Sequence, residues 1–470
     1  MKRCALLLLL VFSGCAVGPD YERPDVEVPA AYKEAGDWKA AQPRDAAGRG
    51  QWWEAFGDSQ LNALVAQVDM SNQNLKVAEA QWRQAVGAVQ QARAALFPTL
   101  ALLNTDTRSR SPSLANAPVT STSAVSAYSL ALNASWAPDF WGGVRRNVEG
   151  GVANAQASAA AVANARLLAQ AQLAIDYFQL RVLDAQRELL DQTVAAYAKT
   201  LELTRNRYGA GVAAKADIVL AETQLRSTQA QAIDLGVQRA QLEHAIAVLI
   251  GKPPAGLTIA RLQLDTPVPE IPAQIPSELL QRRPDVAEAE RRMAAANAQI
   301  GVATAAYFPS VTFSATQGYK SSIFSNLLTA PSRFWSVGAA IGETLFDAGA
   351  RGAVVDQTRA AYDANIASYR QTVLSAFQQV EDNLAALRIL DEEAAVQDDA
   401  VKAARQSTEL TLNQYKAGIV SYLNVVAVQA VQYNNESTAV RLKGQRLVAA
   451  VSLIQALGGG WDASELLAKE

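Results

Sequence analysis

The sequence predicts a mainly helical protein made of two internal repeats, each giving long coiled-coil helices and two strands of a transmembrane β-barrel. Three observations lead to this fold class. Short landmarks recur in the same order in both halves of the chain, helical patterns run unbroken over residues 144–207 and 351–414, and four segments alternate between apolar and polar residues. A compact globular core has no place for helices of that length, so a duplicated, helix-rich protein is the better interpretation.

The composition of the 470-residue chain suits closely packed helices. Half of the residues are hydrophobic, only 7% are aromatic, and alanine is abundant. The net charge is −3 and no run of basic residues occurs, which argues against a nucleic-acid or anionic-lipid partner. Helices that approach one another through small side chains are therefore expected.

Residues 1–14 have the layout of a lipoprotein signal peptide. A basic start and a short apolar stretch, too short to span a bilayer, lead through small residues to Cys15. We expect Cys15 to become the lipidated first residue, with palmitate among its acyl chains and no other cofactor. Because Ala16 rather than aspartate follows, the outer membrane of a Gram-negative bacterium is the expected location. The alternative is an ordinary cleaved signal followed by an incidental cysteine.

A repeat organises the rest of the chain. Three landmarks in the first half recur in the second at nearly one spacing, which predicts two copies over residues 57–251 and 277–459. The pairs are Phe97-Pro98 with Phe308-Pro309 at 211 residues, Gly143 to Arg145 with Gly349 to Arg351 at 206, and Tyr208 to Gly211 with Tyr415 to Gly418 at 207. Residues 15–56 are expected to form an extended N-terminal segment, 252–276 a proline-rich linker, and 460–470 a C-terminal tail.

Each copy has the same predicted order of elements. A helix ends before Pro98 or Pro309, because proline disfavours helix in the residue before it. Two strands follow, and Gly143 or Gly349 marks the corner at which the chain returns into the long helix. The long helix ends at a Tyr-x-Ala-Gly turn, from which a second helix runs back.

The four strands are expected at about 99–108, 126–137, 310–319 and 334–346, with apolar and polar residues on opposite faces. Apolar-out, polar-in alternation over about ten residues is what a membrane β-barrel needs. Amphipathic strands on a soluble core are the alternative for any one strand alone. Four strands cannot close a barrel and open edges cannot face lipid, so membrane strands would require an assembly of two or three copies.

The long helices must pack along their length. At 1.5 Å per residue each would extend on the order of 95 Å. Apolar residues at spacings of three and four supply a seam for each helix, as expected of coiled coils. The seams are Ala171, Ile175, Phe178 and Val182 in the first, and Val373, Phe377, Val380, Leu384 and Leu387 in the second.

Several segments together resemble the outer membrane factor family, in its NodT-type lipoprotein branch. The resemblance covers nearly the whole chain. It rests on Cys15 to Pro24 (CAVGPDYERP), Trp52 to Asp58 (WWEAFGD), Leu280 to Val286 (LQRRPDV), Ala295 to Gly301 (AANAQIG) and Tyr307 to Pro309 (YFP). Separate motifs in the correct order make it more specific than any single pattern.

The resemblance implies a homotrimer with a twelve-stranded barrel in the outer membrane and a twelve-helix periplasmic tunnel, with the 252–276 linker in its equatorial region. The tunnel would end in a closed tip that opens when it docks a periplasmic adaptor. An RND-type inner-membrane pump would drive the transport of drugs or other small toxic compounds. The chain itself would be a passive conduit in contact with outer-membrane lipid.

The two Tyr-x-Ala-Gly turns are the candidate docking site. Gly211 and Gly418 are expected to end their helices as left-handed caps. The resemblance adds that these turns meet the adaptor, which makes Arg207, Tyr208 and Tyr415 further contact candidates.

The candidate periplasmic gate is the pair Asp217 and Asn424, six residues after the two glycines. Local helix capping is the alternative, since Ser421-x-x-Asn424 resembles a capping sequence. The family can carry acidic rings near this place, but Asn424 and Ala427 here supply no aspartate, so any electrostatic gate is expected to be weaker.

No catalytic set emerges, so an enzyme is not expected. The only histidine, His244, lies in a helical stretch, and neither a histidine–cysteine metal cluster nor a glycine-rich phosphate loop occurs. An exit duct for one-step (type I) protein secretion would share nearly all of these features. A lipid-anchored periplasmic coiled-coil scaffold is the alternative from a different class, although it leaves the strand pairs unexplained.

Overall fold

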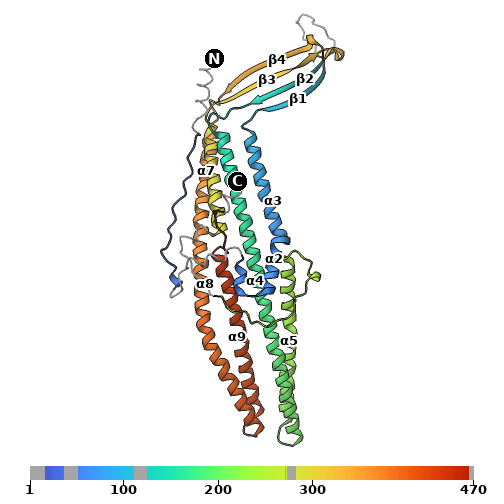
Figure 1. Cartoon of the computed structure of the whole chain (residues 1–470), viewed down its shortest axis with the longest axis vertical. Coiled ribbons are helices and arrows are strands. Elements are labelled where there is room, and N and C mark those ends of the chain that lie inside the picture. The colour runs from blue at the N-terminus through green and yellow to red at the C-terminus, as the bar shows by residue number, and fades with distance from the viewer. Residues whose placement is uncertain (1–15, 36–50, 111–123, 270, 272–281, 465–470) are drawn as a thin grey trace. The chain divides into compact units, whose positions relative to one another are not determined.

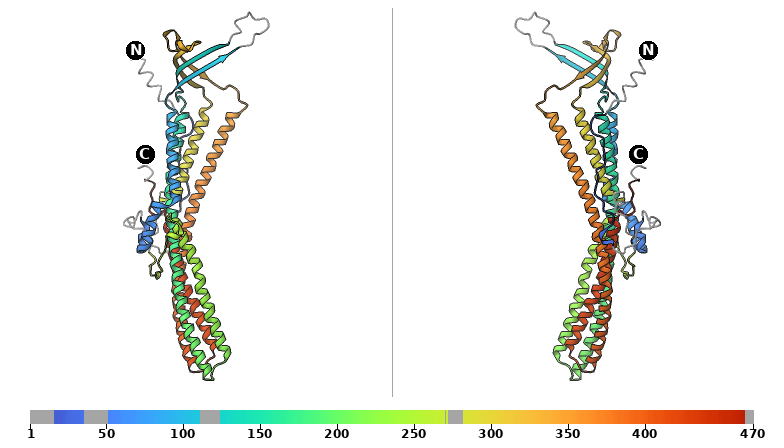
Figure 2. Two further views of the ribbon diagram at one scale, coloured as in Figure 1. Left: turned by 90° about the vertical axis from the view of Figure 1, so that its right-hand side faces the viewer. Right: turned by 90° about the vertical axis from the view of Figure 1, so that its left-hand side faces the viewer.

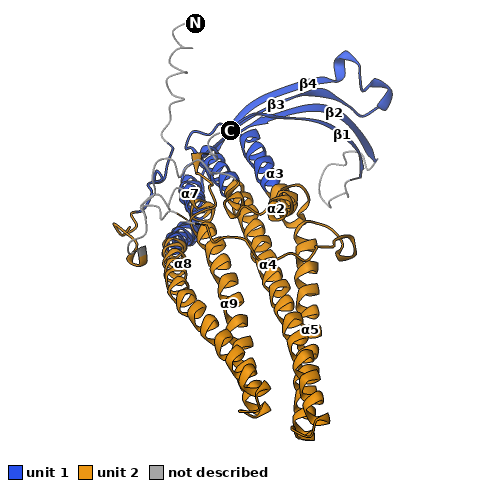
Figure 3. Ribbon diagram, turned by 60° about the horizontal axis from the view of Figure 1, so that its bottom comes forward, with its two compact units in different colours: residues 1–24, 82–157, 289–369 blue, residues 25–81, 158–288, 370–470 orange. Residues whose placement is uncertain are grey.

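The computed structural model describes residues 16–35, 51–110, 124–269, 271 and 282–464. The chain divides into two compact units (Figure 3). Unit 1 holds residues 1–24, 82–157 and 289–369, and unit 2 holds residues 25–81, 158–288 and 370–470. Cys15, the predicted lipidation site, lies outside the described residues.

Unit 1 contains one antiparallel sheet in the order β1-β2-β3-β4 (Figure 1). Its strands are β1 (Thr99–Ser109), β2 (Val125–Trp136), β3 (Ser310–Ser321) and β4 (Arg333–Gly342). The fourth strand ends at Gly342, so the prediction that it reaches residue 346 is wrong. Gly342 pairs with Ser310, which is the first residue of β3. The residue before Ser310 is Pro309, which has no N–H to continue the ladder.

The register sorts apolar and polar residues into alternating rows across the sheet. One row consists of Leu100, Ala134, Ala315 and Val337. The adjacent row consists of Thr99, Ser135, Ser314 and Gly338. Because successive side chains point to opposite faces, one face is apolar and the other carries small polar groups. Side chains of the apolar face are exposed, with Leu100 67% and Val337 75% exposed.

The helices that precede the sheet end at the two phenylalanine–proline corners. Helix α3 (Gln73–Ala94) ends before Pro98, and helix α7 (Pro284–Ala305) ends before Pro309. Each proline is followed at once by a strand. Aromatic residues pack at the second corner, where Trp141 stacks on Phe308 with ring centroids 4.8 Å apart and donates from Nε1 to the Pro309 carbonyl at 2.7 Å.

Two aspartates start the long helices in unit 1. The Asp139 carboxylate accepts from the Val144 and Arg145 N–H groups at 3.0 and 2.8 Å, at the beginning of α4 (Gly143–Gly209). Asp347 accepts from the Gly349 and Arg351 N–H groups at 3.0 and 3.2 Å, at the beginning of α8 (Ala350–Lys416). Both carboxylates satisfy N–H groups that have no partner within the helix.

An extended N-terminal stretch, residues 16–24, lies along the helices of unit 1. Arg146 donates to Asp20 at 2.7 Å, and Asn297 donates to the Pro19 carbonyl at 3.0 Å. Gly18 has a φ of +99°, and a Cβ there would come within 2.5 Å of the Gly301 backbone. Two glycines therefore allow the stretch to lie directly on the backbone of α7.

Unit 2 is built from two helical hairpins that run side by side (Figures 1 and 2). Helix α4 returns as α5 (Lys215–Leu249), and α8 returns as α9 (Tyr422–Ala456). The long helices have 67 residues each, which corresponds to about 100 Å. Within the described part of the chain, no helix is both long enough and apolar enough to cross a membrane.

The predicted seams lie mainly in the interior of unit 2. All five seam residues of α8 are buried, from Val373 to Leu387. In α4, Ala171 and Phe178 are buried, whereas Ile175 and Val182 are half-buried. Around the hairpins pack the short helix α2 (Ser59–Ser71) and the 3-10 turn η3 (Trp52–Phe56), whose Phe56 ring lies 5.0 Å from that of Phe178.

The remaining short elements are 3-10 turns. They are η1 (Lys33–Ala35), η4 (Pro254–Gly256), η5 (Phe324–Asn326) and η6 (Ala330–Ser332). In η1, the N–H groups of Lys33 and Glu34 donate to the Glu381 carboxylate at 2.7 and 2.9 Å. This contact holds the N-terminal part of unit 2 against α8.

A close approach between α4 and α9 depends on a glycine. A Cβ at Gly444 would overlap the Val182 side chain. We expect Gly444→Ala to destabilise the protein by roughly 1–3 kcal/mol, the usual effect of overpacking. The double variant Gly444→Ala with Val182→Ala should recover most of the loss. Thermal unfolding of the purified protein measures both effects.

Gly236→Ala is the matched control, since Gly236 lies within α5 with no atom within 4 Å of an added Cβ. That change should leave stability equal or raise it by about 0.5–1 kcal/mol, because alanine favours helix. Equal destabilisation by both single variants would contradict the steric explanation.

Candidate functional site at the helical hairpin turns

The two hairpin turns are closed by the same backbone arrangement. Gly211 and Gly418 have φ values of +77° and +79°, a conformation that glycine adopts without strain. The Val212 N–H donates to the Arg207 carbonyl at 2.9 Å, and the Ile419 N–H donates to the Gln414 carbonyl at 2.9 Å. This is the Schellman form of helix ending, in which a left-handed residue lets the last carbonyls find partners.

Arg207 joins the two turns. From the end of α4, its Nη1 donates to the carbonyls of Tyr415 and Lys416 at 2.7 and 3.1 Å, and these carbonyls end α8. The guanidinium carbon also lies 4.7 Å from the centre of the Tyr415 ring. A cation at the C-terminus of a helix is favoured by the helix dipole, and hydrogen bonds from a charged donor are stronger than neutral ones.

Behind this contact lies a buried tyrosine pair. Tyr415 and Tyr422 are 2% and 1% exposed, with ring centroids 5.7 Å apart. The Tyr415 hydroxyl lies 3.2 Å from the Thr204 hydroxyl, within hydrogen-bond distance. Burial and the neighbouring Tyr415 raise the pKa of Tyr422 to about 12, so its phenol is neutral at physiological pH. The core around the pair includes Tyr197, Leu201, Ala221, Leu225 and Val425.

The matching positions of the two turns differ in environment. Tyr208 is 46% exposed, whereas its counterpart Tyr415 is buried. The position of Arg207 is taken in the second turn by Gln414. The structure therefore brings Arg207 and Tyr415 together and leaves Tyr208 on the surface.

Apolar side chains are also exposed around the turns. Val212, Ile419 and Leu423 are 62%, 73% and 64% exposed. Exposed apolar residues that gather in one place are typical of surfaces that bind another protein.

The two gate candidates lie in the first turns of the returning helices. The Asp217 carboxylate accepts from the Ala214 N–H at 3.3 Å and so caps α5. Asn424 is exposed, and its N–H donates to the Ser421 carbonyl at 3.2 Å. The Ser421 side chain makes no capping hydrogen bond, so the expected capping arrangement of Ser421 and Asn424 is not formed by side chains.

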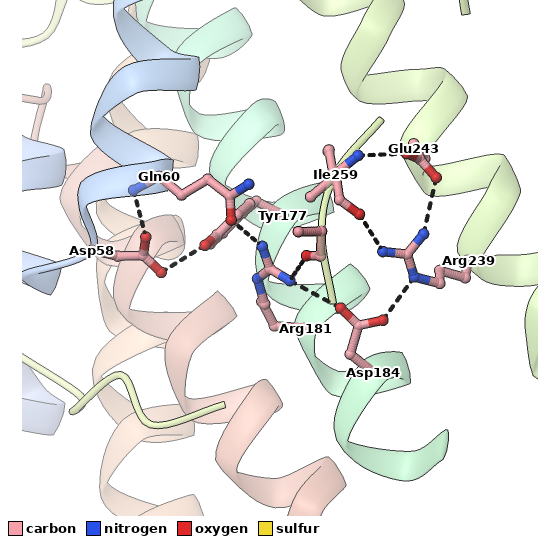
Figure 4. A network of polar contacts seen from close by, with 9 residues as sticks. Asp58, Gln60, Tyr177, Arg181, Asp184, Arg239, Glu243 and Ile259 are labelled. Atoms are coloured by element: carbon pink, nitrogen blue, oxygen red, sulfur yellow. Dashed lines mark hydrogen bonds and ion pairs between the residues drawn. The ribbon is translucent and has the colours of Figure 1, made fainter. Parts of the chain in front are cut away.

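A second polar cluster, the Arg181 network, lies deeper in unit 2 (Figure 4). Arg181 is 1% exposed; it pairs with Asp184 at 2.9 Å and donates to the Ala260 carbonyl at 2.8 Å. Asp184 also pairs with Arg239 at 2.7 Å, and Arg239 donates to the Ile259 carbonyl at 2.7 Å. The network therefore fixes the segment after η4 to both α4 and α5.

The same network reaches α2. Tyr177 donates to the Asp58 carboxylate at 2.7 Å, and Asp58 caps α2 through the N–H groups of Gln60 and Leu61. Arg181 also donates to the Gln60 side chain. No sequence pattern marks these residues as a network, because an arginine three residues before an aspartate is typical of an ordinary surface pair on a helix.

The described residues hold no group of three or more histidine, cysteine, aspartate or glutamate side chains placed to bind a metal ion. His244 is exposed on α5. The site therefore consists of two helical hairpins whose turns are joined by the hydrogen bonds of Arg207.

Comparison with known proteins identifies the class of protein. The sequence matches the family described as Outer membrane efflux protein over residues 64–252 and 275–459. It is 31% identical to the probable efflux pump outer membrane protein TtgC of Pseudomonas putida, over 96% of this chain and 94% of the relative. It is also 31% identical to the pyoverdine export outer membrane protein OpmQ of Pseudomonas aeruginosa, over 98% of each chain.

A solved structure agrees with the sequence relatives. The outer-membrane channel OprN superposes with a TM-score of 0.89 at 28% identity, covering 95% of this chain and 100% of that one. The chain therefore belongs to the outer membrane efflux protein family. Members of this family are channels rather than enzymes, and the chain is an efflux exit duct of the Gram-negative outer membrane.

The contact of Arg207 with the end of α8 can be tested directly. Arg207→Gln removes the charged donor. It gives the first turn a glutamine, as the second turn has at the matching position, Gln414. We expect the Gly418 and Ile419 amides to exchange hydrogen about ten-fold faster, because a hydrogen bond from a charged group contributes on the order of 1.5 kcal/mol. Hydrogen exchange with mass spectrometry on the full-length protein measures this.

Arg205→Gln is the control, since Arg205 pairs with Glu222 at the exposed surface of the first hairpin. An exposed pair contributes little, so exchange in the second turn should stay unchanged. The same acceleration in both variants would show that Arg207 does not act through its contact with α8.

Proposed function

We propose that the chain works as a lipid-anchored homotrimer, in which the two repeats of each copy supply four strands and four long helices. Twelve strands would close a barrel in the outer membrane, and twelve helices would form a periplasmic tunnel. The trimer would be a passive conduit that receives drugs or other small toxic compounds from an RND-type inner-membrane pump and a periplasmic adaptor.

The observation that carries this proposal is the sheet of unit 1. Its order leaves β1 and β4 each with a single neighbouring strand. Open edges in a bilayer leave N–H and C=O groups without partners, at several kcal/mol for each group. Pairing β1 of one copy with β4 of the next removes both edges. The uncovered apolar row at Leu100 and Val337 would then face lipid, and the polar row the lumen.

The hairpin turns support the adaptor as a partner. Their exposed apolar residues, Val212, Ile419 and Leu423, sit beside the joined turns of unit 2. An adaptor that covers this surface would compete for the contacts that Arg207 makes with α8. The interpretation of Asp217 and Asn424 as a weak gate belongs to the same proposal.

Assembly and lipid attachment can be measured together. Native mass spectrometry of the full-length protein, extracted from outer membranes in detergent, should give a trimer with a lipid mass on each copy. Cys15→Ser should lose the lipid mass while remaining trimeric, because the anchor is distant in sequence from the strands. An unmodified monomer would contradict the barrel, since four strands would have no partners.

The role of the turns is tested by charged replacements. Gly211→Asp and Gly418→Asp place a carboxylate at the turn surface, and we expect them to abolish efflux in a strain that depends on this channel. The amount of trimer in the outer membrane should remain near that of the unaltered protein, because each change costs only about 1–2 kcal/mol of local backbone strain. If the trimer is lost instead, the glycines act only as helix caps.

A further inference from the structure

The four long helices of unit 2 line a groove of about 1060 Å³. Its lining comes from positions 207 residues apart, the spacing at which Gly211 recurs as Gly418. Three of these pairs are Val182 with Ile389, Leu183 with Leu390, and Gln238 with Gln445. Equivalent positions of the two hairpins therefore face each other across the groove.

The groove lies on a different side of α4 and α9 from the described part of the linker, residues 252–269. The linker lies on another face, where Lys443 donates to the Leu264 carbonyl and Gln263 donates to Glu188 at 3.3 Å. In contrast, Gly444 and Gln186 line the groove. A helix turns by about 100° per residue, so Lys443 and Gly444 point in different directions.

The chemistry of the groove is amphipathic and lacks negative charge. Aliphatic residues form part of its wall, including Ile389, which is 51% exposed. Side-chain amides such as Gln238 and Gln445 supply donors and acceptors. Arg441 is the one charged residue among the lining residues, all of which lie in the described part of the chain. Arg441 makes no ion pair within that part.

We propose that this groove is a contact site for solutes that pass through the duct, and that it takes neutral or anionic amphipathic organic molecules in preference to cations. The proposal rests on the proposed function, in which the side away from the linker faces the tunnel. The volume is comparable to pockets that take drug-sized ligands, on the order of 300–1,000 Å³. The aliphatic wall would take the apolar body of the solute, the amides its hydroxyl or carbonyl groups, and Arg441 an acidic group.

The test uses single cysteines in the full-length trimer. Gln445→Cys places a thiol in the groove, and Val431→Cys places one on α9 outside it, at a position 53% exposed. The rate of maleimide labelling is measured with and without cholate, an anionic amphipathic steroid. At twice its dissociation constant, cholate should slow labelling of Gln445→Cys about three-fold and leave Val431→Cys unchanged. The cation ethidium at the same concentration should protect neither.

Adding Arg441→Glu to Gln445→Cys should abolish the protection by cholate. As the matched control, Arg226→Glu makes the same charge change on α5 outside the groove and should leave protection intact. Equal protection by ethidium, equal slowing at both cysteines, or loss of protection with Arg226→Glu would overturn the proposal. Native mass spectrometry of the same samples reports the trimer separately, so failure of the assembly is distinguished from failure of the groove.

Discussion

Helices of 67 residues cannot be stabilised from their ends, and this constraint governs the structure. Most helical stability in proteins comes from packing of one face rather than from intrinsic propensity, so α4 and α8 depend on lateral packing along most of their length. Small residues at close approaches, such as Gly444 against Val182, meet this need. The Arg181 network adds a fixed point, because its buried charges are paired and its hydrogen bonds hold α2 and the linker in place.

The parts of the fold that local chemistry decides could be predicted from sequence. Proline before a strand and glycine after a helix act within a few residues, so Pro98, Pro309, Gly211 and Gly418 mark real boundaries. The end of β4 was missed because it is decided by its partner. Leu345 resumes the apolar spacing past Gly342 after the interruption at Glu343, but the ladder stops where β3 begins.

The candidate site was predictable only in part, for the same reason. The turns follow from their glycines, whereas the contact of Arg207 with the end of α8 joins residues 208 positions apart. No local pattern distinguishes Arg207 from an exposed arginine, or the buried Tyr415 from the exposed Tyr208. From sequence, Arg181 resembles a surface residue, because all of its partners except Asp184 come from other segments of the chain. The groove likewise needs four helices in place before its lining can be recognised.

The uncovered sheet of unit 1 has a consequence for folding and aggregation. In the proposed trimer the apolar face and both edges of this sheet would be covered, so a chain that has not yet assembled would expose them, and both features favour wrong strand pairing. The edges carry charges only near the loop ends of the sheet, with Asp106 and Arg108 on β1 and Arg333 on β4. Those charges disfavour pairing with strands of other chains at the loop ends. The ends near Leu100 and Ile341 carry no such charges and remain prone to aggregation. To avoid aggregation under this proposal, the unassembled chain must either be short-lived or have its sheet covered until it assembles.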